Sequence, residues 1–165
     1  NWKVETTADA VAPQQLPKWK LESSAGGKRL AYTSRKQGAS NAILTVALTP
    51  INGQMRVLLI VKPDPAQESS PSWLDYFKYR TDLQIALDGN SYVLAPTSEW
   101  ARAGQVNTAG TQQIWFSAPE AMMQDIKRAK SFTVTPVWRE LPKGLDSETV
   151  FGTEGLTEAL WALSP

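Results

Sequence analysis

The sequence predicts a mainly β protein: an antiparallel β-sandwich or partly open barrel with two short α-helices, at about 118–130 and 154–163. Short segments rich in β-branched and aromatic residues recur along the chain, and glycine, asparagine and proline separate them. This pattern is typical of sheets built from hairpins. Two stretches with a helical period of apolar residues account for the helices. With 165 residues, the chain is long enough to bury one core without disulfides.

The chain divides into a short arm and one domain. Residues 1–17 are polar and end in a proline-flanked QQL, which predicts a flexible N-terminal arm. We expect a single β-sandwich domain over 18–165. It begins with KWKLES (18–23) and KRLAYTS (28–34), two alternating segments joined by a glycine-containing loop, which predict a hairpin.

Two further hairpins follow. NAILTVALT (41–49) and MRVLLIVK (55–62) are nearly continuous apolar runs, so their strands should be buried on both faces or nearly so. DLQIALD (82–88) and SYVLA (91–95) are joined by Asp-Gly-Asn, a sequence that accepts the positive φ of a tight turn. Strands with one buried face are then predicted for QQIWFS and SFTVTPVW, which flank the first helix.

The first helix carries the pattern of a capping box, in which Ser117 and Glu120 satisfy each other's backbone N–H groups, with Pro119 in the first turn. Apolar residues recur on one face, and cations gather where the helix dipole favours them. These are Met122, Met123, Ile126 and Ala129, and then Lys127, Arg128 and Lys130. No residue of this helix is reactive, so we expect it to be structural.

The C-terminal helix follows the strand ETVFG (148–152), and Thr153 is the residue expected to cap it. Its apolar residues fall at positions i, i+3, i+4 and i+7, which predicts one buried face. They are Leu156, Ala159, Leu160 and Leu163. Trp161 lies off the centre of this stripe, and we expect it to close over the edge of the core.

The absence of histidine and cysteine restricts the chemistry. It excludes His- and Cys-based triads, zinc-thiolate sites and the usual general base. A hydrolase with two carboxylates would have to draw on Asp82, Asp88, Glu99 or Glu120, and a retaining pair needs carboxyl groups about 5 Å apart. We therefore expect no enzymatic activity, no metal and no cofactor. The net charge of +1, with dispersed cations, argues against nucleic acid as a partner.

The longest connection lies between the second and third hairpins and ends in a group of aromatic and basic residues. Two interpretations remain open: the aromatics fold onto the sandwich as core, or they form a recognition surface for a partner. If the chain has a partner-binding surface, we expect it there, on Trp73, Tyr76, Phe77, Lys78, Tyr79 and Arg80.

The order of several motifs resembles a known family. Trp19 opens the first strand, VLLIVKPDP ends the fourth, LQIALDG and SFTVTP follow, and the chain closes with VFGTEGLTEAL, which contains Gly155 and Leu156. Over 18–163 this order resembles the invasion-associated locus B family of Gram-negative periplasmic proteins. The last third is also similar to the TagO accessory proteins of type VI secretion. The resemblance implies a periplasmic or secreted β-sandwich without established catalysis. It also implies paired cysteines, which this chain lacks, so packing must replace them.

The leading functional prediction is a non-enzymatic, exported protein-binding module of the bacterial envelope, linked to host interaction and virulence or to secretion. The alternative is a carbohydrate- or peptidoglycan-binding module in which Trp73, Trp100 and Trp115 stack on sugar rings. No apolar run approaches the roughly 18 residues of a membrane span, so no transmembrane segment is expected. A periplasmic or secreted location would fit a chain whose Asn1 follows a removed signal. The partner and the oligomeric state stay open.

Overall fold

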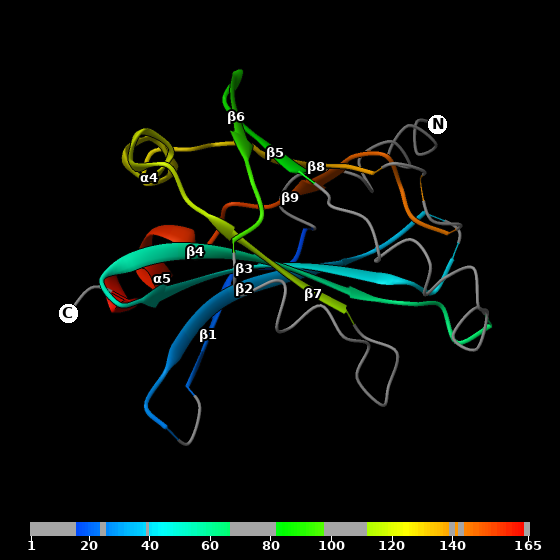
Figure 1. Cartoon of the computed structure of the whole chain (residues 1–165), viewed down its shortest axis with the longest axis horizontal. Helices are drawn as coiled ribbons and strands as arrows, with labels where there is room; N and C mark the ends of the chain where they lie inside the picture. The colour runs from blue at the N-terminus through cyan, green and yellow to red at the C-terminus, as the bar shows by residue number, and fades with distance from the viewer. Residues whose placement is uncertain are drawn as a thin grey trace, which may run out of the picture.

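The computed structural model describes residues 16–23, 26–38, 40–66, 82–97, 112–138, 141 and 144–163. Within these ranges the protein is mainly β, with two antiparallel sheets and two short α-helices (Figure 1). The predicted fold class is therefore confirmed, in its sandwich-like form and without a closed barrel among the described strands. Apart from Leu16 and Pro17, the predicted N-terminal arm lies outside the described residues.

The first sheet has five strands in the order β1-β2-β3-β4-β7. They are β1 (Lys20–Ser23), β2 (Arg29–Lys36), β3 (Ile43–Ile51), β4 (Gln54–Lys62) and β7 (Gln112–Ser117). β1 pairs with β2 and β3 with β4, both antiparallel, which confirms the first two predicted hairpins. The β3–β4 turn needs only two residues, because Asn52 and Gly53 both adopt positive φ, at 51° and 80°.

The second sheet has four strands in the order β6-β5-β8-β9. They are β5 (Asp82–Leu87), β6 (Asn90–Leu94), β8 (Phe132–Val137) and β9 (Thr149–Phe151). The predicted third hairpin forms through Asp88 and Gly89, whose φ values of 49° and 90° again permit a two-residue turn.

The core lies between the two sheets, which form two layers in Figure 1. Side chains alternate between the faces of a strand, so one set of residues from each strand enters this core. From β3 these are Leu44, Val46 and Leu48, and from the second sheet Leu83, Ile85, Phe132, Val134 and Phe151 are all buried.

A buried amide joins the two layers at one corner. The side chain of Gln37, at the end of β2, is fully buried. Its Nε2 lies 3.2 Å from Oγ1 of Thr149 in β9, and its Oε1 accepts a hydrogen bond from the backbone N–H of Asp146 at 3.1 Å. Because buried polar groups are costly unless they are paired, these bonds fix how the sheets meet.

The first helix, α4 (Glu120–Ile126), is shorter than the predicted 118–130, and its cap differs. Its N-cap residue is Pro119, with no side-chain hydrogen bond to the helix. Ser117 is still in β7, opposite Arg56, and the N–H of Ala118 donates to Met55. The predicted capping box is therefore wrong, because strand pairing holds Ser117 in an extended conformation just before the helix.

The C-terminal end of α4 also differs from the prediction. The helix ends at Ile126, and the next N–H groups bond three residues back, with Arg128 donating to Asp125. Lys127 is the C-cap residue and no basic residue lies in the last turn, so the predicted cations follow the end of the helix and do not lie inside it. The apolar face is as predicted: Met122 and Ile126 are buried, and Met123 and Ala129 pack against the core.

The second helix, α5 (Leu156–Leu163), begins two residues later than predicted and buries the whole predicted stripe of Leu156, Ala159, Leu160 and Leu163. One expectation is wrong: Trp161 does not cover the core edge, because 75% of its surface is exposed. The stripe and Trp161 lie on different sides of the helix, as their spacing of 100° per residue requires.

The two ends of the domain meet at Trp19. Its backbone N–H donates to Glu154 at 2.9 Å, and its indole Nε1 donates to the carbonyl of Gly152 at 2.8 Å. The ring packs edge-on against Phe132, with 5.4 Å between centroids. A Cβ on Gly155, whose φ is 82°, would lie 3.0 Å from the Trp19 carbonyl oxygen. The glycines of the FGTEGL segment therefore make room for the start of the first strand.

Candidate functional site

The face of the five-stranded sheet that turns away from the second sheet, which we call the outward face, is unusually apolar. The register places Tyr32, Ala47, Leu58 and Trp115 side by side in one row across β2, β3, β4 and β7. Ala47 and Leu58 are 0% and 4% exposed, yet neither belongs to the core between the sheets. Antiparallel sheets with one solvated face carry polar residues there, so this face departs from the usual pattern.

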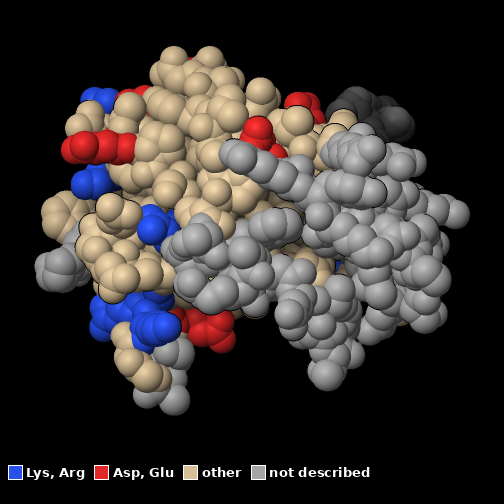
Figure 2. Space-filling model, in the orientation of Figure 1, with Lys and Arg blue, Asp and Glu red and all other residues tan. Residues whose placement is uncertain are grey.

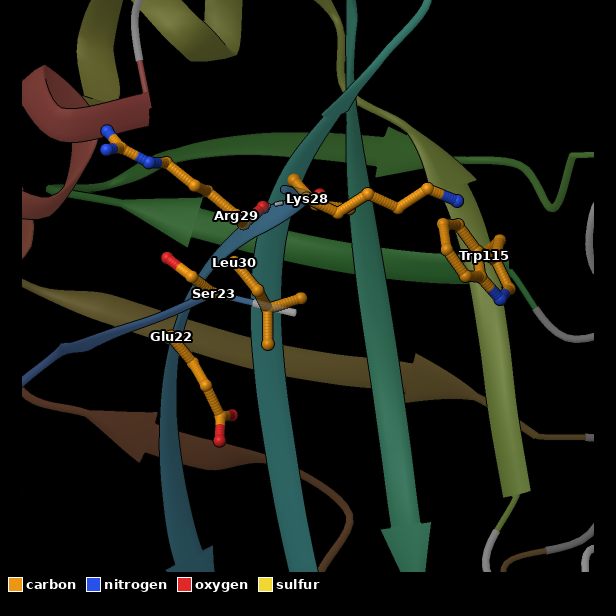
Figure 3. A pocket seen from close by; sticks show the side chains of 7 residues that line it. Glu22, Ser23, Lys28, Arg29, Leu30 and Trp115 are labelled. Carbon is orange, nitrogen blue, oxygen red and sulfur yellow. Dashed lines mark hydrogen bonds between the residues drawn. The ribbon is translucent and has the colours of Figure 1, made fainter. Parts of the chain in front are cut away.

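A pocket of about 370 Å³ opens on the outward face beside this row (Figure 3). The tip of the β1–β2 hairpin forms one wall, β3 contributes to the floor, and Trp115 of β7 forms the opposite wall. Its lining residues are Glu22, Ser23, Lys28, Arg29, Leu30, Thr49 and Trp115. This volume is near the lower end of the range of about 300–1,000 Å³ for small-ligand pockets, enough for one large side chain or one sugar ring.

The two cations of the hairpin point in opposite directions (Figure 3). The side chain of Lys28 extends across the strands toward the indole ring of Trp115. That of Arg29 runs to α5, where its guanidinium donates to the carbonyl of Ala162 at 2.7 Å. Arg29 therefore contributes to the end of α5, and Lys28 brings a positive charge to the pocket.

The polar groups on the floor and far wall are fixed by backbone contacts. Thr49 donates through Oγ1 to the carbonyl of Arg29 at 2.8 Å, which holds the start of β2 against β3. The carbonyl of Trp115 accepts a hydrogen bond from the N–H of Thr97 at 2.8 Å. The buried Nε1 of Trp115 has no hydrogen-bond acceptor in the described part of the chain. Hydrogen bonds within the chain thus hold the floor and the far wall of the pocket in place.

The residues that line the pocket suit a ligand that has both an apolar group and a charge. Leu30 and the indole of Trp115 offer apolar surface to a flat or bulky group. Lys28 brings a cation toward Trp115, and Glu22 places an anion at the hairpin side. In Figure 2, Lys and Arg side chains gather over the start of β2, with acidic side chains next to them. Such an apolar pocket with charges at its rim suits a side chain of another protein better than an uncharged cofactor.

The predicted partner surface cannot be placed. Trp73, Tyr76, Phe77, Lys78, Tyr79 and Arg80 all lie outside the described residues, as does Trp100. Of the predicted site residues, Trp115 is described, and it lines the pocket.

Sequence reasoning missed Glu22, Lys28 and Leu30 as pocket residues, because no local motif links the first hairpin to β7. The signal that could have found this face was the near-continuous apolar character of the second hairpin. That character predicted strands covered on both faces, but it could not indicate where a pocket would open.

The candidate carboxylates do not form a pair on β5. Asp82 begins the strand and Asp88 follows its end, so six residues of extended chain separate them by about 20 Å. Glu120 lies in the first turn of α4, and Glu99 is outside the described residues. Asp88 has a structural role: its carboxylate accepts hydrogen bonds from the backbone N–H groups of Lys130 and Ser131 and from the Ser131 hydroxyl.

Those bonds also explain the acidity of Asp88. The backbone N–H of Lys130 is the largest influence that lowers the pKa of Asp88 from its ordinary value of 3.8. A general acid needs the opposite shift, so this carboxylate is fitted to hold the β5–β6 turn against the segment after α4.

Two features are absent from the described residues. No group of three or more carboxylate side chains among them could hold a metal ion. None of the helices they form has the length and apolarity needed to cross a bilayer.

Comparisons with known proteins give a likeness to solved structures and no match by sequence. No family model matches the chain. No curated protein matches it either. Among solved structures, the chain is similar to the crystal structure of invasion associated protein b from Bartonella henselae, with 10% identity, 90% of this chain and 92% of that chain covered, and a TM-score of 0.48. Identity and TM-score at this level carry no functional argument.

Proposed function

We propose that this chain is a non-enzymatic protein-binding module of the bacterial envelope, working in the periplasm or after secretion, and that it holds its partner on the outward face. The pocket between the β1–β2 hairpin and Trp115 is the observation that carries this proposal. An indole wall, the apolar side chain of Leu30 and a nearby lysine are the features of an interface centre, where aromatic anchors dominate the binding energy.

Ala47 and Leu58 of the neighbouring row are buried, so Leu30 and Trp115 provide the apolar surface that the pocket offers to a partner. A partner that inserts one large apolar side chain and places a carboxylate near Lys28 would use both parts of the site. A link to host interaction or to secretion is part of the proposal and depends on who the partner is.

The test is capture followed by affinity measurement. The tagged wild-type protein is incubated with bacterial envelope extract, the recovered protein is purified, and its affinity is measured by calorimetry. We expect Trp115→Ala to weaken binding about 30-fold, the effect of losing one strong anchor. Trp115→Phe keeps an aromatic ring and should weaken binding less. Lys28→Ala should weaken binding and reduce its dependence on salt.

Matched controls lie elsewhere on the molecule. Trp161→Ala removes an indole of α5 that is 75% exposed, and Lys62→Ala removes an exposed cation at the other end of β4. Both should leave the affinity unchanged. If the control variants weaken binding as much as the pocket variants do, the partner binds elsewhere and the assignment of the outward face is wrong.

Trp115 also favours a second candidate, a carbohydrate- or peptidoglycan-binding module, because an indole wall can stack on a sugar ring. Soluble peptidoglycan fragments provide the test, by calorimetry with the wild type and Trp115→Ala. Saturable heat with the fragments, absent in Trp115→Ala, would favour this candidate. Heat with the purified protein partner alone would favour the first.

A further inference from the structure

The first sheet ends in a short strand that no described strand pairs on its outer side. β1 is the terminal strand of the order β1-β2-β3-β4-β7, and its four residues, Lys20 to Ser23, are all exposed. In Figure 1 it forms the blue border of the sheet. An exposed edge presents unpaired backbone N–H and C=O groups, which are a template for another strand.

The opposite edge of the same sheet, β7, is partly covered. Along β7, Pro96 forms a bridge with Phe116, and the N–H of Thr97 donates to Trp115, so the 96–97 segment occupies part of that edge. In the second sheet β6 is also an edge, with Val93 61% exposed. It contains no charged residue that would select a register. β1 therefore combines an open edge with charged residues that can specify a partner.

The side chains of β1 alternate in a defined way. Leu21 is opposite Ala31, a core residue, so Leu21 points inward, while Lys20 and Glu22 point to the outward face. Leu21 keeps 43% of its surface exposed despite its inward direction, because β1 lies at the rim of the core. The strand thus has one exposed apolar residue on one face and one charge of each sign on the other.

Antiparallel pairing allows a strand to meet its own copy in only a few registers. In an antiparallel pair, two directly opposite residues either both point their N–H and C=O groups at the partner strand or both point them away. When the two strands are copies related by a two-fold axis, this condition requires the axis to pass through a residue, which then lies opposite its own copy. An axis at Lys20 or at Glu22 places identical charges opposite each other, which is destabilising. An axis at Leu21 places Lys20 opposite Glu22 twice and Leu21 opposite Leu21. This register alone makes every charge contact favourable.

We propose that two copies of this chain associate through β1, antiparallel and with the two-fold axis at Leu21, to form one continuous ten-stranded sheet. Backbone pairing supplies the attraction, the Leu21 contact buries apolar surface, and two Lys20–Glu22 pairs select the register. Lysine usually protects an edge from pairing. Here Glu22, two residues later, pairs with Lys20 of the second copy, so the lysine favours association with the same sequence.

The experiment is a charge-swap series followed by sedimentation equilibrium of the full chain over a concentration range. The mass of the wild type should rise from 18.2 kDa toward twice that value as concentration increases. Lys20→Glu places glutamates opposite glutamates, and Glu22→Lys places lysines opposite lysines, so each variant alone should remain at 18.2 kDa. An equimolar mixture of the two variants pairs opposite charges again and should recover the association of the wild type.

Further variants test whether the charge pairs of β1, and not a general change of charge, control the association. The double variant Lys20→Glu with Glu22→Lys restores opposite charges in one chain and should associate by itself. Lys36→Glu and Lys62→Glu change exposed cations far from β1 and should associate like the wild type. All substituted residues are exposed, and equal thermal midpoints will show that the fold is intact.

Three results would overturn the proposal. If the wild type stays monomeric at every concentration, the β1 edge does not pair with a second copy; it then binds a strand of another protein or faces solvent. Single variants that associate as well as the wild type place any dimer on another surface, β6 included. Single variants that do not associate, with a mixture that also fails, show that the charges matter but that the register is wrong.

Discussion

Single glycines in this fold are distinguished by what lies next to them. Gly53 and Gly155 have nearly the same positive φ, 80° and 82°, but a Cβ on Gly53 meets nothing within 4 Å. A Cβ on Gly155 lies 3.0 Å from the backbone oxygen of Trp19. Backbone atoms cannot move aside as cheaply as the end of a flexible side chain. The two positions therefore separate conformational strain from close approach.

We expect Gly53→Ala to destabilise the protein by about 1 kcal/mol, the cost of a left-handed alanine. Gly155→Ala should cost about 1 to 3 kcal/mol more, because the added methyl group overpacks the contact with Trp19. Urea denaturation of both variants measures the difference. Equal losses of stability would mean that the segment around Gly155 shifts freely and that Trp19 is not tightly held.

Asp88 gives a second prediction at this scale, on pH. Its lowered pKa means that the folded state favours the carboxylate, so its contribution to stability is present above the ordinary value of 3.8 and is lost as the pH falls. Asp88→Asn retains a residue that tolerates the positive φ but removes the charge. The variant should melt below the wild type at pH 7, and the gap should shrink in acid below about pH 4.

The measurement is the thermal midpoint of both proteins at pH 7 and pH 3. Asp88→Ala is the companion variant: it also loses the hydrogen-bond acceptor and the tolerance of positive φ, so it should melt lowest at pH 7. A gap between wild type and Asp88→Asn that is the same at both pH values would contradict a role for the charge.

At the scale of elements, α5 is held by its buried stripe and not by its tryptophan. Leu160 is 5% exposed and belongs to the core, so Leu160→Ala should destabilise the fold by about 2 to 5 kcal/mol. Trp161→Ala, at the adjacent but 75% exposed position, should change stability little. Chemical denaturation compares the two, and a large loss for Trp161→Ala would mean that the indole packs after all.

The elements also show what sequence can and cannot predict. Hairpins were predicted correctly because alternation and turn residues such as Asn52 and Gly53 are local signals. The α4 cap was predicted wrongly because Ser117 also pairs with Arg56 of β4, a distant contact that overrides a local motif. The pairing of β7 with β4 and of β8 with β5 has no local signal either, since it depends on which apolar faces meet in the core.

The pocket illustrates the same limit. Trp115 was a candidate from its residue type, but Lys28 and Leu30 reach it only because β2, β3, β4 and β7 lie side by side in the sheet.

For the whole molecule, the titratable groups predict a broad plateau of stability. Asp64 and Asp88 have a lowered pKa, each chiefly through backbone N–H bonds, so their contribution is lost only in acid, below 3.8. The hydrogen bond to Asp125 raises the pKa of Tyr92 above 10.0, so that contribution is complete below this pH and is lost as the pH rises further. The Gln37 contacts between the sheets are neutral and do not titrate.

With no histidine or cysteine in the chain, no side chain has an ordinary pKa between 6 and 8. We therefore expect the free energy of unfolding to be the same at pH 6 and pH 8, and to fall below about pH 4 and above about pH 10. Urea titrations across the range provide the check, with constant salt as the control. A clear change between pH 6 and pH 8 would reveal a strongly shifted group.

The bond from the Trp19 indole to Gly152 joins residues 133 positions apart in the chain. During synthesis at about 5–20 residues per second, Trp19 is added to the chain roughly 7 to 27 seconds before its acceptor is made. For all that time the first strand has no C-terminal segment to close against, and its apolar residues remain available to chaperones. The contact between Trp19 and Gly152 can therefore form only after most of the chain has been made, so this corner of the fold is completed late.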